Sequence, residues 1–148
     1  MRLLLAATAA LSLAACDHQP PEPKVEVEGA VVQLPAVPGR PGAAYFTLRT
    51  NNDPTKLVSV TSPRVERIEL HETVEEGGVS RMRPLQSGTF EGKEMKFEAG
   101  GKHAMLFGVD PALRAGDRIP LTFNLEPMQP VTVEAEVRAF GGGGHAQH

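Results

Sequence analysis

The sequence predicts a single all-β domain of the sandwich or barrel class, and three observations support this. Thirteen prolines and fifteen glycines divide the 148 residues into short runs. Apolar and polar residues alternate within those runs, as at Ile119, Leu121, Phe123 and Leu125, which is the period of a strand with one buried face. No stretch has the 3.6-residue period of an amphipathic helix. About 120 residues follow the N-terminal segments, which is enough for one domain with its own core.

The alternation predicts nine strands separated by turn signals. We expect them over 25–32, 43–50, 56–61, 67–74, 79–85, 95–98, 103–109, 119–125 and 131–139. Residues 35–41 form a proline-rich loop, and 111–117 is either one helical turn or a plain connection. The expected core contains Tyr45 or Phe46, Leu48, Val58, Val60, Ile68, Leu70, Leu106, Phe123, Val133 and Val137.

The N-terminus predicts export and lipidation. Residues 1–15 have a minimal positive start and an apolar run too short to span a bilayer, as in a signal peptide. The run ends in Leu13-Ala14-Ala15-Cys16, which resembles the bacterial lipoprotein signal-peptidase box and implies that Cys16 is lipidated. The alternative is an ordinary signal peptide with an incidental cysteine. Asp17 resembles an inner-membrane retention signal, which favours a periplasmic protein anchored to that membrane.

Two polar segments flank the predicted domain at 25–139. Residues 16–24 hold three prolines among polar residues and are expected to form a semi-extended tether. Residues 140–148 are rich in glycine and are expected to form a flexible tail. His145 and His148 in that tail could bind Cu(II) weakly, although incidental histidines are the simpler interpretation.

Charge and composition favour a binding function. The net charge is -3 and no basic cluster is present, which argues against nucleic-acid binding. No nucleophile, base and orienting group occur in an arrangement typical of catalysis. We therefore expect a protein that is not an enzyme.

His103 and Met105 form the first half of a candidate metal site. Residues i and i+2 of a strand share a face, so these two side chains should point the same way. Thioether sulfur suits Cu(I), and imidazole suits copper in general. A thioether, unlike a thiol, cannot form a disulfide in an oxidising compartment.

His71 and Met82 form the second half, across a predicted hairpin. A symmetric turn of two or four residues centred on 76–77 pairs Val74 with Val79. That register places His71 directly opposite Met82 on one face of the sheet. The alternative is that each methionine fills the core, as Met95 is expected to do.

The four residues and their spacing resemble the His, Met, His-x-Met signature of the periplasmic PCu(A)C-type copper chaperones. Twenty residues separate Met82 from His103, one fewer than is usual in that family. The resemblance covers roughly 25–137 and includes the segments 42–48, 57–60, 69–73, 81–84, 113–117 and 131–133.

The resemblance implies a fold, a ligand and a destination. The fold would be a cupredoxin-like Greek-key β-sandwich. Cu(I) would be bound by His71, Met82, His103 and Met105, and would be delivered to a protein acceptor in cytochrome c oxidase copper-centre assembly.

Three functions remain open at this point. The leading hypothesis is a membrane-tethered copper(I) chaperone without catalytic activity. The second is a copper scavenging or tolerance lipoprotein, which has the same site but no dedicated client. The third is a β-sandwich lipoprotein that binds no metal, which predicts that Met82 and Met105 are buried in the core.

Overall fold

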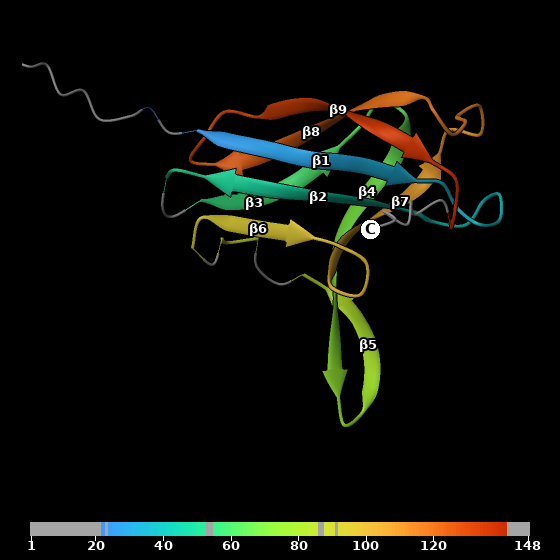
Figure 1. Ribbon diagram of the computed structural model, residues 1–148, viewed down its shortest axis with the longest axis horizontal. Coiled ribbons are helices and arrows are strands. Elements are labelled where there is room, and N and C mark those ends of the chain that lie inside the picture. Colours follow the sequence, from blue (N-terminus) through green and yellow to red (C-terminus); the bar gives the residue numbers. More distant parts are fainter. Residues whose placement is uncertain (1–21, 23, 53–54, 86–87, 91, 142–148) are drawn as a thin grey trace, which may run out of the picture.

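The computed structural model describes residues 22, 24–52, 55–85, 88–90 and 92–141, and these form strands and connections without a helix. The strands are β1 (Val25–Gln33), β2 (Gly42–Thr50), β3 (Lys56–Thr61), β4 (Val65–Glu76), β5 (Val79–Pro84), β6 (Glu94–Phe97), β7 (Lys102–Val109), β8 (Arg118–Glu126) and β9 (Val131–Arg138) (Figure 1). The nine predicted strands are confirmed, with ends that differ by at most two residues. Residues 111–117 are a plain connection.

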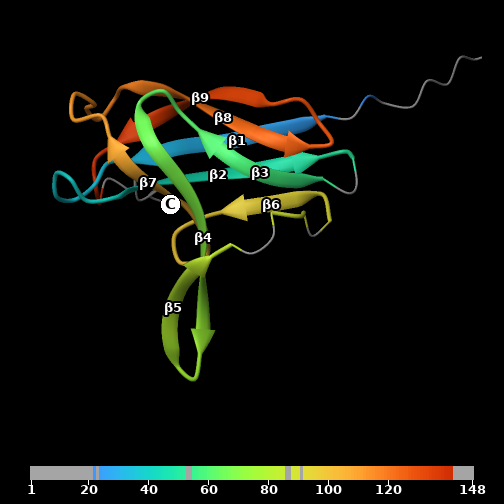
Figure 2. The same ribbon diagram turned by 180° about the vertical axis from the view of Figure 1, so that it is seen from behind.

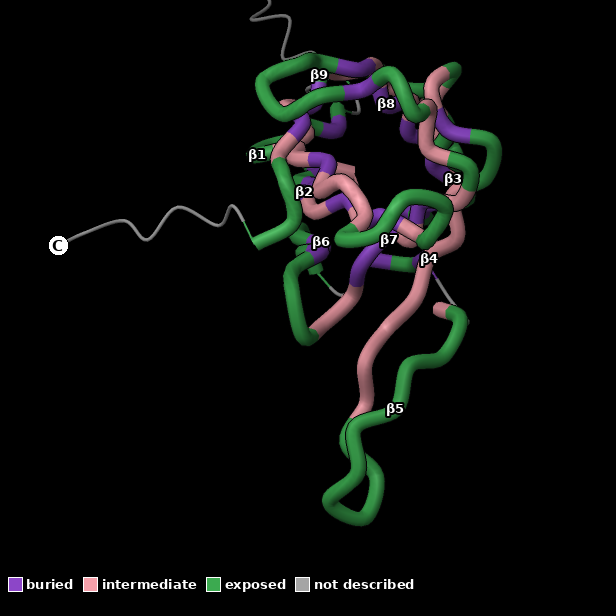
Figure 3. The backbone as a smooth tube through the Cα atoms, turned by 90° about the vertical axis from the view of Figure 1, so that its right-hand side faces the viewer, coloured by how far each residue is buried: buried purple, intermediate pink, exposed green. Residues whose placement is uncertain are grey.

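The strands form one continuous sheet in the order β3-β8-β9-β1-β2-β6-β7-β4-β5. This sheet curls around its own inner face (Figure 3). Phe46 on β2 and Phe123 on β8 show the curling, because β1 and β9 lie between these strands in the sheet but the two rings meet edge to face at 4.8 Å. The enclosed face holds the core, as in a sandwich.

The core is made by the inward residues of the alternating strands. Phe46, Leu48, Val60, Leu106, Phe123 and Val137 are buried as predicted, and Ile68, Leu70 and Val133 pack partly buried against them. Met95 is also buried, as expected. Tyr45 lies outside the core, and Phe46 takes the inward position.

The prediction for Val58 is wrong, because its side chain is 48% exposed. The pairing of β3 with β8 is irregular between Leu57 and Ser59. A bulge adds one residue to a strand and interrupts its alternation. Leu57 and Val60 therefore both face inward, and Val58 is turned to solvent.

Strands β4 and β5 form a hairpin that extends beyond the rest of the sheet (Figures 1 and 2). All six residues of β5 are exposed. The turn consists of Gly77 and Gly78, with φ of 61° and 77°, as a two-residue type I′ turn requires. It pairs Glu76 with Val79, so the predicted pairing of Val74 with Val79 is wrong. A two-residue turn at 76–77 would have required the left-handed conformation at Glu76, which strains a residue with a side chain.

The start of the domain is held by Asn51, which follows β2. Its side chain accepts a hydrogen bond from the backbone N–H of Lys24 at 2.6 Å and donates one to the carbonyl of Glu22 at 2.9 Å. The predicted signal peptide, Cys16, Asp17, His145 and His148 lie outside the described residues. Within the part of the chain described, no helix is long and apolar enough to cross a membrane.

Candidate metal centre

Backbone pairing brings the predicted ligands to one face of neighbouring strands. His71 on β4 lies directly opposite His103 on β7, and Glu69 lies opposite Met105. Met82 on β5 lies opposite Thr73, two residues from the predicted partner His71. A register shift of two residues preserves the face of every side chain. Met82 and His71 therefore share a face as predicted, but as diagonal neighbours rather than a direct pair.

The His103 ring is oriented by the backbone. The residue is 8% exposed, and its Nδ1 lies 3.0 Å from the carbonyl oxygen of Gly101. A carbonyl can only accept, so Nδ1 carries the proton and Nε2 keeps its lone pair. Neutral imidazole in this tautomer can coordinate a metal through Nε2.

The His71 ring is oriented by a carboxylate. Its Nε2 lies 3.1 Å from Oε2 of Glu69, which accepts the hydrogen bond and leaves the lone pair on Nδ1. That Nδ1 atom is buried and has no hydrogen-bond partner among the described residues. An unpartnered buried polar atom costs about 1–3 kcal/mol, and a metal ion would satisfy it. The His71 and His103 ring centroids are 6.1 Å apart.

Glu69 is suited to this role because it stays ionised. The hydrogen bond from His71 is the main effect that holds the pKa of the Glu69 carboxyl below its ordinary range, and the charge of Arg67 adds to it. Glu69 lies on the same face as His71, two residues earlier in β4. The i−2 spacing was the available signal for this contact, but surface carboxylates at that spacing are common.

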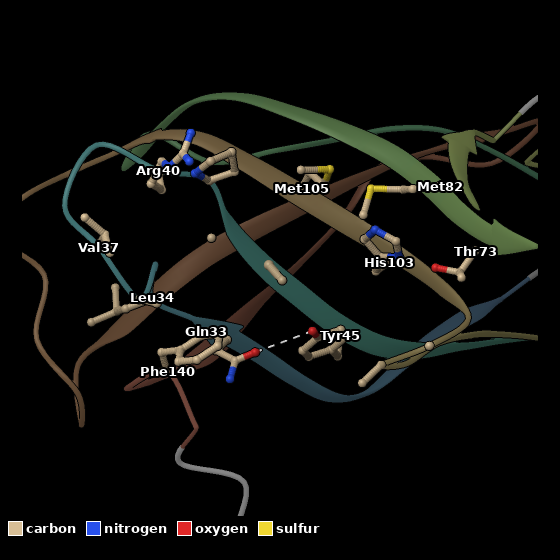
Figure 4. Close-up of a pocket in the computed structure, with 16 residues that line it drawn as sticks. Gln33, Leu34, Val37, Arg40, Tyr45, Thr73, Met82, His103, Met105 and Phe140 are labelled. Atoms are coloured by element: carbon tan, nitrogen blue, oxygen red, sulfur yellow. Dashed lines mark hydrogen bonds between the residues drawn. The ribbon is translucent and has the colours of Figure 1, made fainter. Parts of the chain in front are cut away.

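Met82, Met105 and His103 line one open pocket of about 480 Å³. Figure 4 shows both methionine side chains directed toward the same space beside the His103 ring. His71 lines a separate depression with Glu69 and Ser59. Thus three predicted ligands share one pocket, and the fourth, His71, is outside its lining but lies directly opposite His103.

The methionines are not ordinary core residues. Met82 is 55% exposed on a hairpin strand without a buried residue, and Met105 is only half-buried. The hypothesis that both fill the core is therefore wrong for Met82 and unsupported for Met105. Although the spacing between Met82 and His103 is short, both side chains remain on the pocket face.

The donor set is soft. Nowhere in the described ranges do three or more His, Cys, Asp or Glu side chains gather in a way that could hold a metal ion. Two neutral imidazoles and two thioethers match the preferences of Cu(I) rather than those of zinc, magnesium or calcium.

Solved structures define the class of the fold. The chain is similar to the copper-bound PCuAC domain from PmoF2, with a TM-score of 0.61, 21% identity and coverage of 78% of this chain and 93% of that one. It is also similar to CuI-DR1885 from Deinococcus radiodurans, with a TM-score of 0.60, 29% identity and coverage of 74% and 75%. The protein has an all-β, cupredoxin-like fold similar to that of the PCuAC domains, as the sequence resemblance implied.

The family model that matches is described as "LpqE-like: Putative lipoprotein LpqE-like", over residues 25–137, and the chain belongs to that family. "Uncharacterized protein RP573" of Rickettsia prowazekii (strain Madrid E) is 32% identical over 107 residues, which are 68% of this chain. "Putative lipoprotein Lxx21020" of Leifsonia xyli subsp. xyli (strain CTCB07) is 30% identical over 103 residues, again 68% of this chain. The matches span 53% and 62% of these two relatives.

Proposed function

We propose that the protein is a membrane-tethered copper(I) chaperone that acts outside the cytoplasm and has no catalytic activity. Copper(I) is its cargo, held by His71, Met82, His103 and Met105. One observation carries the proposal: two histidines, each with one ring nitrogen not used in a hydrogen bond, and two thioethers lie on one face of neighbouring strands. Similarity to the solved PCuAC structures adds support, because two of those structures are copper-bound.

The tether in this proposal is the lipid carried by Cys16. The lipoprotein-like box before Cys16 and membership of a lipoprotein-like family support it. Residues 16–24 then link the anchor to the domain in the periplasm, with Asp17 favouring the inner membrane. Acyl chains supply the membrane affinity, at about 0.8 kcal/mol per buried CH2 group.

Exchange, not tight sequestration, suits the shape of this site. Met82 is exposed at the edge strand of the sheet, so an acceptor can approach from the solvent side. An incoming donor atom can then coordinate copper before Met82 leaves, and the metal is never without ligands. An enclosed site would instead have to open before release.

The site is tested by an anaerobic Cu(I) competition titration of the domain from residue 17 onward. Leucine is close in volume to methionine and is well tolerated in its place, so Met82→Leu with Met105→Leu removes the sulfurs and preserves the packing. We expect one-to-one binding in the parent domain and a loss of about 100-fold or more in the double variant, since two soft ligands are absent.

Met128→Leu is the matched control, because Met128 lies outside the pocket. A chain ending at Gly141 tests whether the tail histidines matter for Cu(I). Equal affinity in the parent and the double variant would refute the thioether site.

Delivery to cytochrome c oxidase is the finer part of the proposal. Copper-loaded protein is mixed anaerobically with an apo copper-centre domain of the oxidase, and both proteins are separated and assayed for copper. We expect the metal to move to the acceptor. Retention of copper by the loaded protein would favour the scavenging function instead.

A further inference from the structure

We infer that the pocket containing Met82, His103 and Met105 is also the docking surface for the copper acceptor, and that the acceptor is a protein with an anionic copper-binding segment. Arg40 would be the electrostatic anchor for that segment. This inference rests on the proposed function and names the chemistry of the partner.

The pocket is lined mainly by apolar side chains, and the charged side chain among them is positive. Sixteen residues line it, and Arg40 is the only Asp, Glu, Lys or Arg among them. Three exposed apolar side chains surround the space: Val37 at 58%, Phe140 at 66% and Met82 at 55% exposure. Exposed apolar residues gathered at one site are typical of an interaction surface. Figure 4 shows Arg40 and Val37 at one end of the pocket and His103 and Met82 at the other.

The charge of Arg40 is available to a partner. Its side chain is exposed and makes no ion pair with any residue that the structure describes. By contrast, Arg49, Arg64 and Arg83 are each paired with a carboxylate. Because the whole chain has a net charge of -3, an anionic partner is repelled by the molecule as a whole and attracted at this face. Such a field orients an approaching partner.

Bound Cu(I) would strengthen the preference for an anionic partner. Imidazole and thioether ligands are neutral, so the loaded site keeps the single positive charge of Cu(I). An acceptor with a thiolate or carboxylate ligand neutralises the charge of Cu(I). The same negative charge on the acceptor is attracted by Arg40. Transfer then proceeds from a neutral ligand set to an anionic one, which gives the exchange a direction.

The test compares two copper(I) chelators that share the same phenanthroline nitrogens. Bathocuproine disulfonate is anionic because of its sulfonate groups, whereas neocuproine is uncharged. Copper-loaded protein is mixed with each by anaerobic stopped flow, at low and high salt. We expect Arg40→Glu to slow transfer to the anionic chelator by about five-fold at low salt. The effect should be screened at high salt, and the rate with neocuproine should not change.

Arg118→Glu is the matched control, since it makes the same charge change on β8, outside the pocket. Equal slowing with both chelators, an equal effect of Arg118→Glu, or a changed Cu(I) affinity in Arg40→Glu would each overturn the inference. If the parent protein bound no Cu(I), the proposed function would fail, and the inference with it. Normal binding without charge-dependent transfer would remove the inference alone.

Discussion

At the scale of single residues, the two histidines are prepared for a metal through different ring nitrogens. Gly101 accepts from Nδ1 of His103, and Glu69 accepts from Nε2 of His71. Hydrogen bonds of this kind fix the tautomer and orientation of a ligating histidine. His103 would therefore coordinate through Nε2 and His71 through Nδ1, the buried atom without a partner.

Glu69→Ala should lower Cu(I) affinity by about ten-fold, because His71 would no longer be held in one tautomer. Glu69→Gln should retain most of the affinity, since an amide oxygen can still accept from Nε2. Nitrogen-15 NMR of the apo domain should show the His71 tautomer becoming mixed in the alanine variant alone. Glu75→Ala, on the same strand, is the control. An unchanged tautomer in Glu69→Ala would contradict this role.

At the scale of elements, strand β5 of the β4–β5 hairpin carries the proposed ligand Met82 and contributes no buried residue to the core. Gly77 has φ of 61° and its added Cβ would meet nothing within 4 Å, so Gly77→Ala strains the turn by about 1–2 kcal/mol without a clash. Because that strain falls on the hairpin, we expect Cu(I) affinity to drop by about five-fold, with little change in Tm.

The control for the hairpin is Gly116→Ala, at a turn with φ of 95° and equally open space. Titration and thermal unfolding of both variants separate the two effects. A loss of Tm without a loss of affinity in Gly77→Ala would show that Met82 does not depend on the turn.

At the scale of the whole molecule, an ion pair links distant parts of the chain. Asp110, after β7, accepts from Arg64, between β3 and β4, at 2.8 Å. The backbone N–H of Ala112 and then Arg64 hold the pKa of Asp110 below its ordinary value of 3.8. A lowered carboxyl pKa stabilises the fold above the ordinary value, and that contribution is lost as the pH falls through the lowered pKa.

Asp110→Asn should therefore lower Tm at neutral pH. The difference from the parent should be constant down to about pH 5 and should shrink below the ordinary value of 3.8. Thermal unfolding, followed by circular dichroism at about ten pH values between roughly 2.5 and 7, measures this difference in Tm. Glu75→Gln serves as the control, because Glu75 makes no ion pair with the described residues. A difference that stayed constant into acid would contradict the assignment.

The sequence predicted the strands and the faces of the candidate ligands, because both follow from a period of two. It could not predict the bulge that exposes Val58. Nor could it predict the register of the hairpin, which places Met82 opposite Thr73 instead of His71. A bulge depends on the partner strand, and an adjacent Gly77-Gly78 pair allows several turns. The contact of Glu69 with His71 had only a common spacing as its signal, and the place of Arg40 in the pocket depends on segments that the curled sheet brings together.

Strand β1 has a consequence for the geometry of the anchored protein. It begins beside Glu22 and Lys24, where Asn51 holds the incoming chain, and it ends at Gln33, which lines the pocket. Nine residues of strand span roughly 26 Å between their first and last Cα atoms. If Cys16 is lipidated as proposed, the length of β1 separates the pocket from the end of the domain that is nearest the anchor. The point of attachment and the open pocket are at opposite ends of β1, so the loaded metal is presented to proteins that project above the bilayer rather than to the lipid surface.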